Sequence, residues 1–417
     1  PSTHRIESLL DLLNHPEHQV PAIHITGTNG KTSTARIATA ILASAGLSVG
    51  TYTSPHLVSL RERIALSGEP ITPDAFADVF DHVKPYLDVV EKDLGERISY
   101  FELLTAMFFL WASETPVDAL VVEVGLGGRW DATNVLESSV PVITHVALDH
   151  TAHLGADRVT IAKEKAGIIK PGSIVVTAER SPEVLAVIEA AVTSAQGQIA
   201  RIGREFDLLE NRVAFGGRYL SLDGSGGTYE GLFLPLHGAH KGVNAALALE
   251  AVIRLIPAQK LDQAVVAEGL AATTAPGRLE TVRSDDTSVP IVLDVAHNPD
   301  GMSAMITSLV EAFAFDRVVF VVGILADKDH KGMLSEMARV PCTLMVTSPK
   351  SVRSAPLNEL QATSEQLGLE CELIDDVADA VKHAMATARE RDLICITGSH
   401  YVVGEARALL LPSEATI

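Results

Sequence analysis

One short stretch, residues 25–33, constrains this chain more than any other, because a glycine-rich turn there joins an apolar run to a helical pattern. Glycines let backbone N–H groups turn toward an anion, and the following helix points its positive end at the same place. A lysine in the turn adds a full positive charge. The stretch predicts a phosphate-binding loop, formed by Thr28, Asn29, Gly30, Lys31, Thr32 and Ser33.

The loop carries only part of a standard P-loop motif. The full pattern has another glycine five residues before Gly30, where this chain has Ile25. A glycine-rich strand-to-helix turn with a solvated lysine is the alternative interpretation of the same residues.

Charge and cysteine content limit the classes of function. The 417 residues include 33 basic and 53 acidic side chains, for a net charge of −20. This excess argues against nucleic acid or an anionic membrane as a partner, but it leaves room for a local basic pocket. Cys342, Cys371 and Cys395 lack metal-ligand spacing, and we expect reduced thiols in a cytoplasmic protein.

Strand-like runs alternate with helical patterns along most of the chain, which is typical of an α/β fold with a mainly parallel sheet covered on both faces. In the first part we expect strands at 22–26, 48–53, 119–124, 140–145 and 173–177, and helices at 32–45, 101–113 and 182–195. Short alternating runs with glycine clusters at 206–236 predict hairpins appended to the main sheet.

A second, smaller α/β domain is expected after the segment 272–278. Helical patterns at 241–255 and 262–271 precede this segment, and strand-like runs at 290–295, 317–322, 342–347 and 393–397 follow it. We place the boundary between domains 1–273 and 274–417. Ligands in such folds bind beyond the carboxyl ends of strands, so the functional cleft should lie between the two domains.

Two polar residues at expected strand ends are candidates for metal binding. Ser54, after the strand 48–53, belongs to a simple turn or presents its hydroxyl to a metal ion. Glu123 ends an apolar strand, where a buried carboxylate needs a partner. In a nucleotide site that partner is Mg²⁺, and the alternative is a structural Glu–Arg pair.

The glycine-rich run 125–128 introduces a polar segment. It should let Arg129, Asp131, Thr133 and Asn134 approach a ligand closely. His150 follows another expected strand and is either a structural histidine or a metal ligand. Lys165 has a salt bridge as its default role, and carbamylation beside a divalent ion is the alternative.

The second domain has its own strand-end motif, at residues 294–301. Asp294 and His297 either cap the next helix or hold the nucleotide and a second substrate across the cleft. Arg278, in the expected hinge, is placed to contact phosphates. Residues 327–331 are expected to form a solvated turn, and residues 397–401 the rim of the cleft.

Seven motifs in this order, spread over residues 5–404, resemble the folylpolyglutamate synthase/dihydrofolate synthase family of the Mur ligase superfamily. They are Gly27-Thr28-Asn29-Gly30-Lys31, Thr53-Ser54-Pro55-His56-Leu57, Glu123-Val124-Gly125-Leu126-Gly127-Gly128-Arg129, Leu148-Asp149-His150-Thr151, Glu164-Lys165-Ala166-Gly167-Ile168, Pro276-Gly277-Arg278-Leu279-Glu280 and Asp294-Val295-Ala296-His297-Asn298-Pro299.

The resemblance implies a monomeric, ATP-dependent ligase that joins L-glutamate to a pterin or folate carboxylate through an acyl phosphate. It implies a P-loop ATPase domain, a Rossmann-like C-terminal domain, and Mg²⁺, with two ions expected. The implied metal ligands are Ser54, Glu123 and His150; the implied ATP contacts are the loop 28–33, Asn244, Arg278 and Asp294; the implied catalytic residues are Lys31, carbamylated Lys165, Asp294 and His297.

At one position this chain departs from the family and matches a related group of ligases. Many members have glycine after the P-loop lysine, where this chain has Thr32, as cell-wall amino-acid ligases do. A cell-wall ligase and a P-loop nucleotide switch without ligase activity are therefore the alternatives. Whether the enzyme makes dihydrofolate, extends folate tails or does both depends on pocket shape, and our working hypothesis is both.

Overall fold

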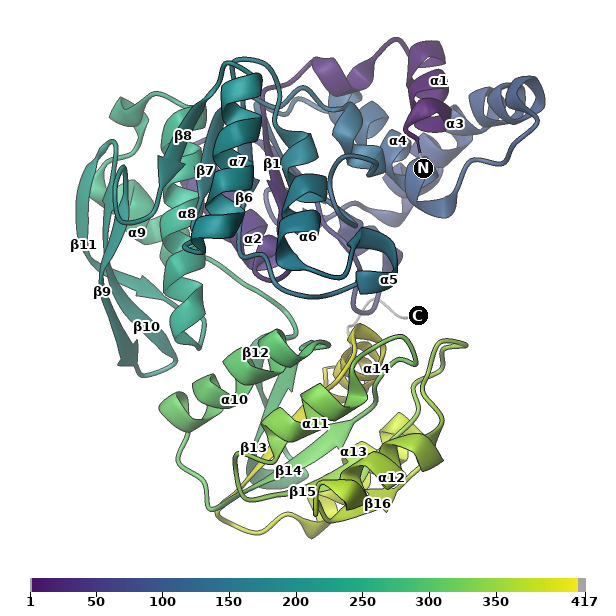
Figure 1. The fold of residues 1–417 in the computed structure, drawn as a ribbon, viewed down its shortest axis with the longest axis vertical. Coiled ribbons are helices and arrows are strands. Elements are labelled where there is room, and N and C mark those ends of the chain that lie inside the picture. The colour runs from purple at the N-terminus through teal and green to yellow at the C-terminus, as the bar shows by residue number, and fades with distance from the viewer. Residues whose placement is uncertain (1, 412–417) are drawn as a thin grey trace.

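The computed structural model describes residues 2–411, which form two α/β domains, one above the other in Figure 1. The larger domain is built on an eight-stranded sheet of order β4-β3-β2-β5-β1-β6-β7-β8. Only β3 and β4 run antiparallel to their neighbours in this sheet. Its strands are β1 (Ala22–Thr26), β2 (Val49–Tyr52), β3 (Ile64–Leu66), β4 (Glu69–Pro70), β5 (Ala119–Glu123), β6 (Val140–Ile143), β7 (Ile174–Thr177) and β8 (Gln198–Arg201).

Helices cover both faces of this sheet, because its central strands are apolar on both sides. The buried apolar residues of α2 (Lys31–Ser44), α8 (Ala239–Leu255) and α9 (Gln263–Ala271) share one core cluster. On the other face lie α1 (His4–Leu12), α3 (Pro73–Leu94), α4 (Tyr100–Glu114), α6 (Arg158–Lys165) and α7 (Pro182–Ser194). The short α5 (Thr151–Leu154) precedes α6.

The hairpins expected at 206–236 are present, but they form a sheet of their own. β9 (Asp207–Ala214), β10 (Gly217–Gly224) and β11 (Gly227–Leu234) pair antiparallel in the order β11-β10-β9. Leu220 and Leu232 pack into the same core as α8, so the small sheet lies against that helix. The expected hairpins are thus appended to the domain through α8 and do not pair with the main sheet, whose edge strands are β4 and β8.

The smaller domain contains a six-stranded sheet of order β12-β13-β17-β14-β15-β16, in which only β12 is antiparallel. The strands are β12 (Arg278–Ser284), β13 (Thr287–Asp294), β14 (Arg317–Val322), β15 (Cys342–Val346), β16 (Cys371–Leu373) and β17 (Asp392–Thr397). One face carries α10 (Pro299–Ala312), α11 (His330–Met337) and α12 (Leu357–Gln366); the other carries α13 (Val377–Thr387) and α14 (His400–Leu410).

The carboxyl ends of strands from both parallel sheets meet at the junction between the domains. β1, β2, β5 and β6 deliver their loops there from above, and β13, β14 and β17 from below (Figure 1). The expected boundary between residues 273 and 274 falls in the connection between α9 and β12. Across residues 2–411, no helix has both the length and the apolar character needed to cross a membrane.

Candidate active site

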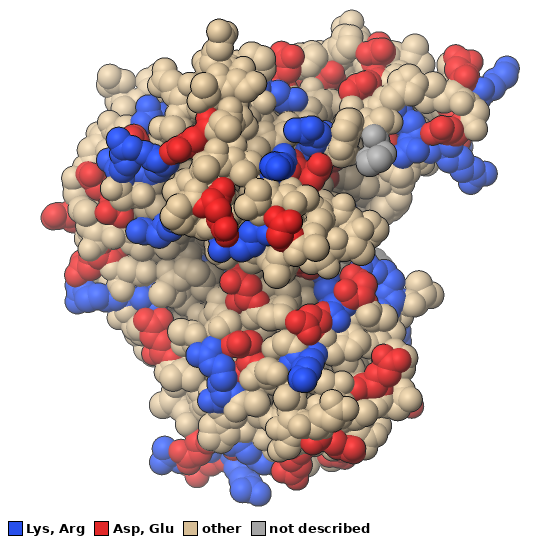
Figure 2. All heavy atoms as spheres, in the orientation of Figure 1, with Lys and Arg blue, Asp and Glu red and all other residues tan. Residues whose placement is uncertain are grey.

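A cavity of about 890 Å³ lies where the strand ends of the two domains meet. Figure 2 shows the molecule hollowed between its upper and lower parts. In a chain with a net charge of −20 this lining is locally basic, because lysines and arginines outnumber the carboxylates. The basic residues are Lys31, Arg63, Lys165, Arg180, Lys241, Arg278, Lys328 and Arg353, and the acidic ones are Glu123, Asp131, Asp149, Asp294 and Asp300.

The glycine-rich turn has the geometry expected of a phosphate-binding loop. Gly30, with a φ of 91°, is the N-cap of α2, so the free N–H groups of that helix face the cavity. The Lys31 ammonium folds back onto the loop and donates to the carbonyls of Gly27 (3.1 Å) and Thr28 (3.2 Å). The Nδ2 of Asn244, a buried residue facing Gly30, has no hydrogen-bond partner among the described residues. An acceptor atom of a ligand bound at the loop would receive a hydrogen bond from this Nδ2.

Glu123 lies at the centre of a small polar cluster beside the loop. Its Oε1 accepts from the Thr32 hydroxyl at 2.9 Å, and its Oε2 accepts from the backbone N–H of Ser54 at 3.2 Å. Burial raises the pKa of Glu123, while the charges of Lys31 and Arg278 oppose that rise. Hydroxyl and carboxylate oxygens are the donors that Mg²⁺ prefers, so Glu123, Thr32 and Ser54 fit a magnesium ion.

A second carboxylate, Asp149, is held by donors from the other domain. Its Oδ1 accepts from Lys328 Nζ at 2.7 Å, and its Oδ2 accepts from Asn298 Nδ2 at 3.0 Å. The Nε2 of His297 lies 3.4 Å from Oδ2. Burial alone would raise the pKa of Asp149, but the hydrogen bond and charge of His297 and the charge of Lys328 hold it well below its usual value.

His150 lines the cavity next to Asp149, and its Nε2 lies 3.4 Å from Lys328 Nζ. It adopts a left-handed φ of 49° as the N-cap of α5. Burial lowers the pKa of His150 to about 4. The ring is therefore neutral near pH 7, which is the form that binds a metal ion.

Lys165 is a buried lysine whose ammonium donates to the carbonyl of Gly27 at 2.8 Å. Burial, reinforced by the charge of Lys31, lowers the pKa of Lys165 to about 7. At neutral pH, Lys165 is therefore an uncharged amine in a large fraction of the molecules. Such an amine is a nucleophile, unlike an ordinary solvated lysine.

Residues near the start of the second domain connect it to the phosphate-binding loop. Arg278 donates from a terminal guanidinium nitrogen to the Thr32 hydroxyl at 3.1 Å. Asp294, at the end of β13, accepts from the backbone N–H groups of Leu279 and Ala296, each at 2.9 Å. Burial raises the pKa of Asp294, and the charges of Lys241 and Arg278 oppose that rise. Asp294 thus lines the cavity and also holds the backbone at the start of β12.

The polar segment after Glu123 serves mainly to brace its own loop. Of Arg129, Asp131, Thr133 and Asn134, only Asp131 lines the cavity. Thr133 is fully buried and donates to Asp131 at 2.6 Å, while Asn134 donates to the carbonyl of Arg129 at 2.9 Å. Gly128 permits close approach to α6, because a Cβ there would lie 2.7 Å from the Glu164 carbonyl oxygen. Substrate binding by these four residues stays a prediction.

Comparison with known proteins agrees with this geometry. Residues 277–400 match the family model described as "Mur ligase, glutamate ligase domain". A Mycobacterium tuberculosis protein named dihydrofolate synthase/folylpolyglutamate synthase is 40% identical over 441 residues, covering 98% of this chain and 90% of the relative. The chain belongs to the dihydrofolate synthase/folylpolyglutamate synthase family. The resemblance and the expected enzyme class, an ATP-dependent ligase that adds glutamate, are confirmed.

Solved structures of family members share the whole fold. A Mycobacterium tuberculosis folylpolyglutamate synthase, complexed with ADP and AMPPCP, superposes with a TM-score of 0.94 at 40% identity, covering 99% of this chain and 96% of that one. An Escherichia coli protein in complex with DHPP and ADP superposes with a TM-score of 0.86 at 30% identity, covering 98% and 92%. The expected P-loop domain and smaller C-terminal domain are thereby confirmed.

Two cavity lysines of this family member were missed by sequence reasoning. Lys328 was assigned to a solvated turn, which is wrong: its side chain is only 5% exposed and pairs with Asp149. Lys241 is buried and donates to the Ser33 hydroxyl at 3.0 Å. Both lie more than 170 positions from their partners, and local sequence carries no signal for such contacts.

Proposed function

We propose that this enzyme is bifunctional, adding L-glutamate both to dihydropteroate and to folates that already carry glutamate. The observation that carries the proposal is the convergence of Lys31, the Glu123 cluster and Arg278 on one cavity between the domains. That cavity is large enough for a drug-sized ligand. Relatives bearing the double name cover nearly the whole chain, which supports the same assignment.

In this proposal the loop 28–33 holds the phosphates of ATP. When ATP binds, Lys31 gives up its hydrogen bonds to the two loop carbonyls and donates to phosphate oxygens instead. The buried Nδ2 of Asn244 donates to the nucleotide. Arg278 contacts the phosphates from the side of the second domain. Preorganised cations of this kind supply most of the rate in phosphoryl transfer, because they act where charge is redistributed.

Ser54, Glu123 and His150 are proposed to hold Mg²⁺, with the Thr32 hydroxyl beside them. Bound Mg²⁺ neutralises phosphate charge, so that an anionic carboxylate can approach the γ-phosphorus. Glu123 is the residue most dependent on such an ion, since its described hydrogen-bond donors are a neutral hydroxyl and a backbone N–H. We also propose that the enzyme is a monomer and that it is cytoplasmic.

Lys165 is proposed to be carbamylated and to position the second metal ion. Its neutral amine forms a bond to the carbon of CO₂ and releases a proton, which leaves an anionic carbamate. The lowered pKa of Lys165, about 7, supplies the neutral amine that this step needs. In ¹³C-bicarbonate, a carbamate resonance should appear in the wild type and be absent in Lys165→Met; no resonance in either protein would contradict carbamylation.

The reaction then has two steps. A substrate carboxylate oxygen bonds to the γ-phosphorus as ADP leaves, and the amine of glutamate displaces phosphate from the acyl phosphate, losing one proton. Asp294 and His297 are proposed to hold the nucleotide and the incoming glutamate, since both face the cavity from the second domain. Enclosure between the domains protects the acyl phosphate from water.

The test is Mg²⁺-dependent release of ADP with ATP and L-glutamate, using dihydropteroate, tetrahydrofolate or no pterin as acceptor. Release with both pterins is expected. Release with only one would contradict bifunctionality and assign the specificity. Release that ignores every acceptor would favour a nucleotide switch and overturn the proposal.

A further inference from the structure

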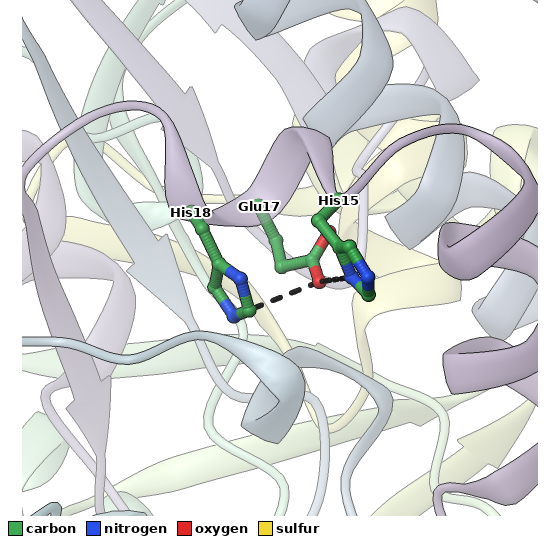
Figure 3. Close-up of side chains that lie close together, drawn as sticks. All are labelled: His15, Glu17 and His18. Carbon is green, nitrogen blue, oxygen red and sulfur yellow. Dashed lines mark hydrogen bonds and ion pairs between the residues drawn. The ribbon is translucent and has the colours of Figure 1, made fainter.

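A group of potential metal ligands lies far from the cleft, in the connection between α1 and β1. Residues His15, Glu17 and His18 belong to a single turn around the 3₁₀ helix Pro16–His18 (Figure 3). Each offers one ligand atom, and these atoms all lie within 4.8 Å of one another. None of the three lines the cavity between the domains. Across residues 2–411 this is the only three-member group of histidine, cysteine or carboxylate ligands that meets this spacing.

Glu17 at the centre of the group lacks the partner that a buried carboxylate needs. The residue is only 4% exposed, and its Oε2 has no hydrogen-bond partner among the described residues. Its ion-pair partners within residues 2–411 are the two histidines alone, with no lysine or arginine. A buried carboxylate without a cation is costly, and a metal ion bound to Glu17 would supply the missing positive charge.

The spacing of the ligand atoms favours the metal ion. Glu17 Oε1 lies 3.2 Å from His15 Nδ1 and 3.7 Å from His18 Nε2. Ligands about 2.0–2.1 Å from a tetrahedral zinc ion are about 3.3 Å apart, so little movement would bring these three onto one ion. Both histidines are partly exposed, which leaves a route for the ion and for a water as fourth ligand.

A further carboxylate stands behind one of the histidines. Asp11 Oδ1, on the last turn of α1, lies 3.7 Å from the Nε2 of His15. If His15 binds a metal ion through Nδ1, its Nε2–H points at this carboxylate. Histidine ligands are commonly oriented by such an outer carboxylate, which fixes the tautomer and increases the basicity of the ring.

We propose that His15, Glu17 and His18 form a binding site for a zinc-type divalent transition-metal ion, with Asp11 orienting His15. Two imidazole nitrogens and one carboxylate oxygen are a donor set that suits Zn²⁺ better than Mg²⁺. The turn packs against α4 and leads into β1, which carries the phosphate-binding loop. Because all three ligands belong to this turn and none lines the cavity, the ion stabilises the turn itself and takes no part in the ligase reaction.

The test compares Zn²⁺ binding by tag-free protein, stripped with EDTA, with that of Glu17→Gln, His15→Asn and His18→Gln. Isothermal titration should show one equivalent of Zn²⁺ that each variant loses, and Co²⁺ in its place should give the intense visible bands of a four-coordinate ion. The matched control is His82→Asn, because His82 and Glu114 form an exposed pair at 3.0 Å without a third ligand. This variant should bind as the wild type does.

Asp11→Asn should bind the same single equivalent with about tenfold lower affinity, as expected for loss of an outer carboxylate. The two histidine variants change exposed side chains and should fold, so the test survives even if Glu17→Gln does not. Equal Zn²⁺ stoichiometry and affinity in the wild type and all three ligand variants would overturn the proposal.

Discussion

Glu123 and Asp149 are buried carboxylates in neighbouring loops of the same domain, yet their surroundings differ in kind. Glu123 follows β5, and burial raises its pKa although the charges of Lys31 and Arg278 and its two hydrogen-bond donors oppose that rise. Asp149 follows β6, and His297 and Lys328 of the other domain hold its pKa well below the usual value despite burial. Glu123 thus has no charged hydrogen-bond donor among the described residues, while Asp149 has the Lys328 ammonium and joins the domains.

Neutralising Glu123 should have the largest effect and tests the contrast between the two carboxylates most directly. Glu123→Gln keeps the shape of the side chain but removes the charge that should hold Mg²⁺, so kcat is expected to fall by about 10³-fold with the fold intact. Steady-state ADP release and far-UV circular dichroism would measure the two properties. Glu137→Gln, at an exposed carboxylate of the same domain, is the control. Normal turnover in Glu123→Gln would contradict the metal assignment.

Lys31→Ala tests the cation that opposes the rise in the pKa of Glu123. Loss of this ammonium should reduce kcat/KM for ATP by about 10²-fold, because it removes a contact to the transferred phosphoryl group. The same ADP assay checks it, with the exposed Lys163→Ala as the matched variant. An unchanged kcat/KM would mean that the Lys31 ammonium only holds the turn, through the carbonyls of Gly27 and Thr28.

Lys328→Met removes the charge that holds Asp149. The free energy of unfolding should fall by about 2 kcal/mol, the typical contribution of a hydrogen bond to a charged group. Chemical denaturation measures this difference. Lys331→Met, at an exposed lysine of the same segment, should change stability by less than about 0.5 kcal/mol. If both variants were equally stable, Asp149 and Lys328 would not join the domains energetically.

The two carboxylates should also respond to pH with opposite sign. The lowered pKa of Asp149 contributes stability that is present above its unfolded pKa, about 3.9, and is lost as pH falls below it. The raised pKa of Glu123 contributes stability at low pH that is lost as pH rises through its folded pKa. Stability curves of Asp149→Asn should fall less steeply below about pH 4, and those of Glu123→Gln should lose less stability as pH rises above the unfolded glutamate pKa, about 4.3. Curves parallel to wild type in both variants would contradict the contrast.

Local pattern predicted much of the fold, because apolar runs and their flanking turns are local properties. The strands at 22–26 and 317–322 have the predicted bounds, and the loop 28–33 joins a strand to a helix as expected. The features that local pattern did not predict depend on tertiary contacts. Local pattern could not show that the strands after residue 206 form a sheet of their own. It also could not show that Lys328 pairs with a residue 179 positions away.

The site was predicted in the same uneven way. Strand-end residues such as Ser54 and Glu123 could be found, since parallel strands bring their carboxyl ends together. The segment 129–134 looked like a ligand contact from its polar composition alone. In the structure Gly128, just before this segment, packs against α6, and Thr133 hydrogen-bonds to Asp131, a geometry that no spacing in the sequence reveals.

Arg278 is both the first residue of β12 and a donor to Thr32, which in turn donates to Glu123. The junction between the domains and the surroundings of Glu123 are therefore coupled through one hydroxyl group. A change in the orientation of the smaller domain would move the Arg278 guanidinium relative to Thr32 and so alter the hydrogen bond that Glu123 receives. A substitution at Arg278 should therefore affect both the packing of the domains and the carboxylate of the larger one.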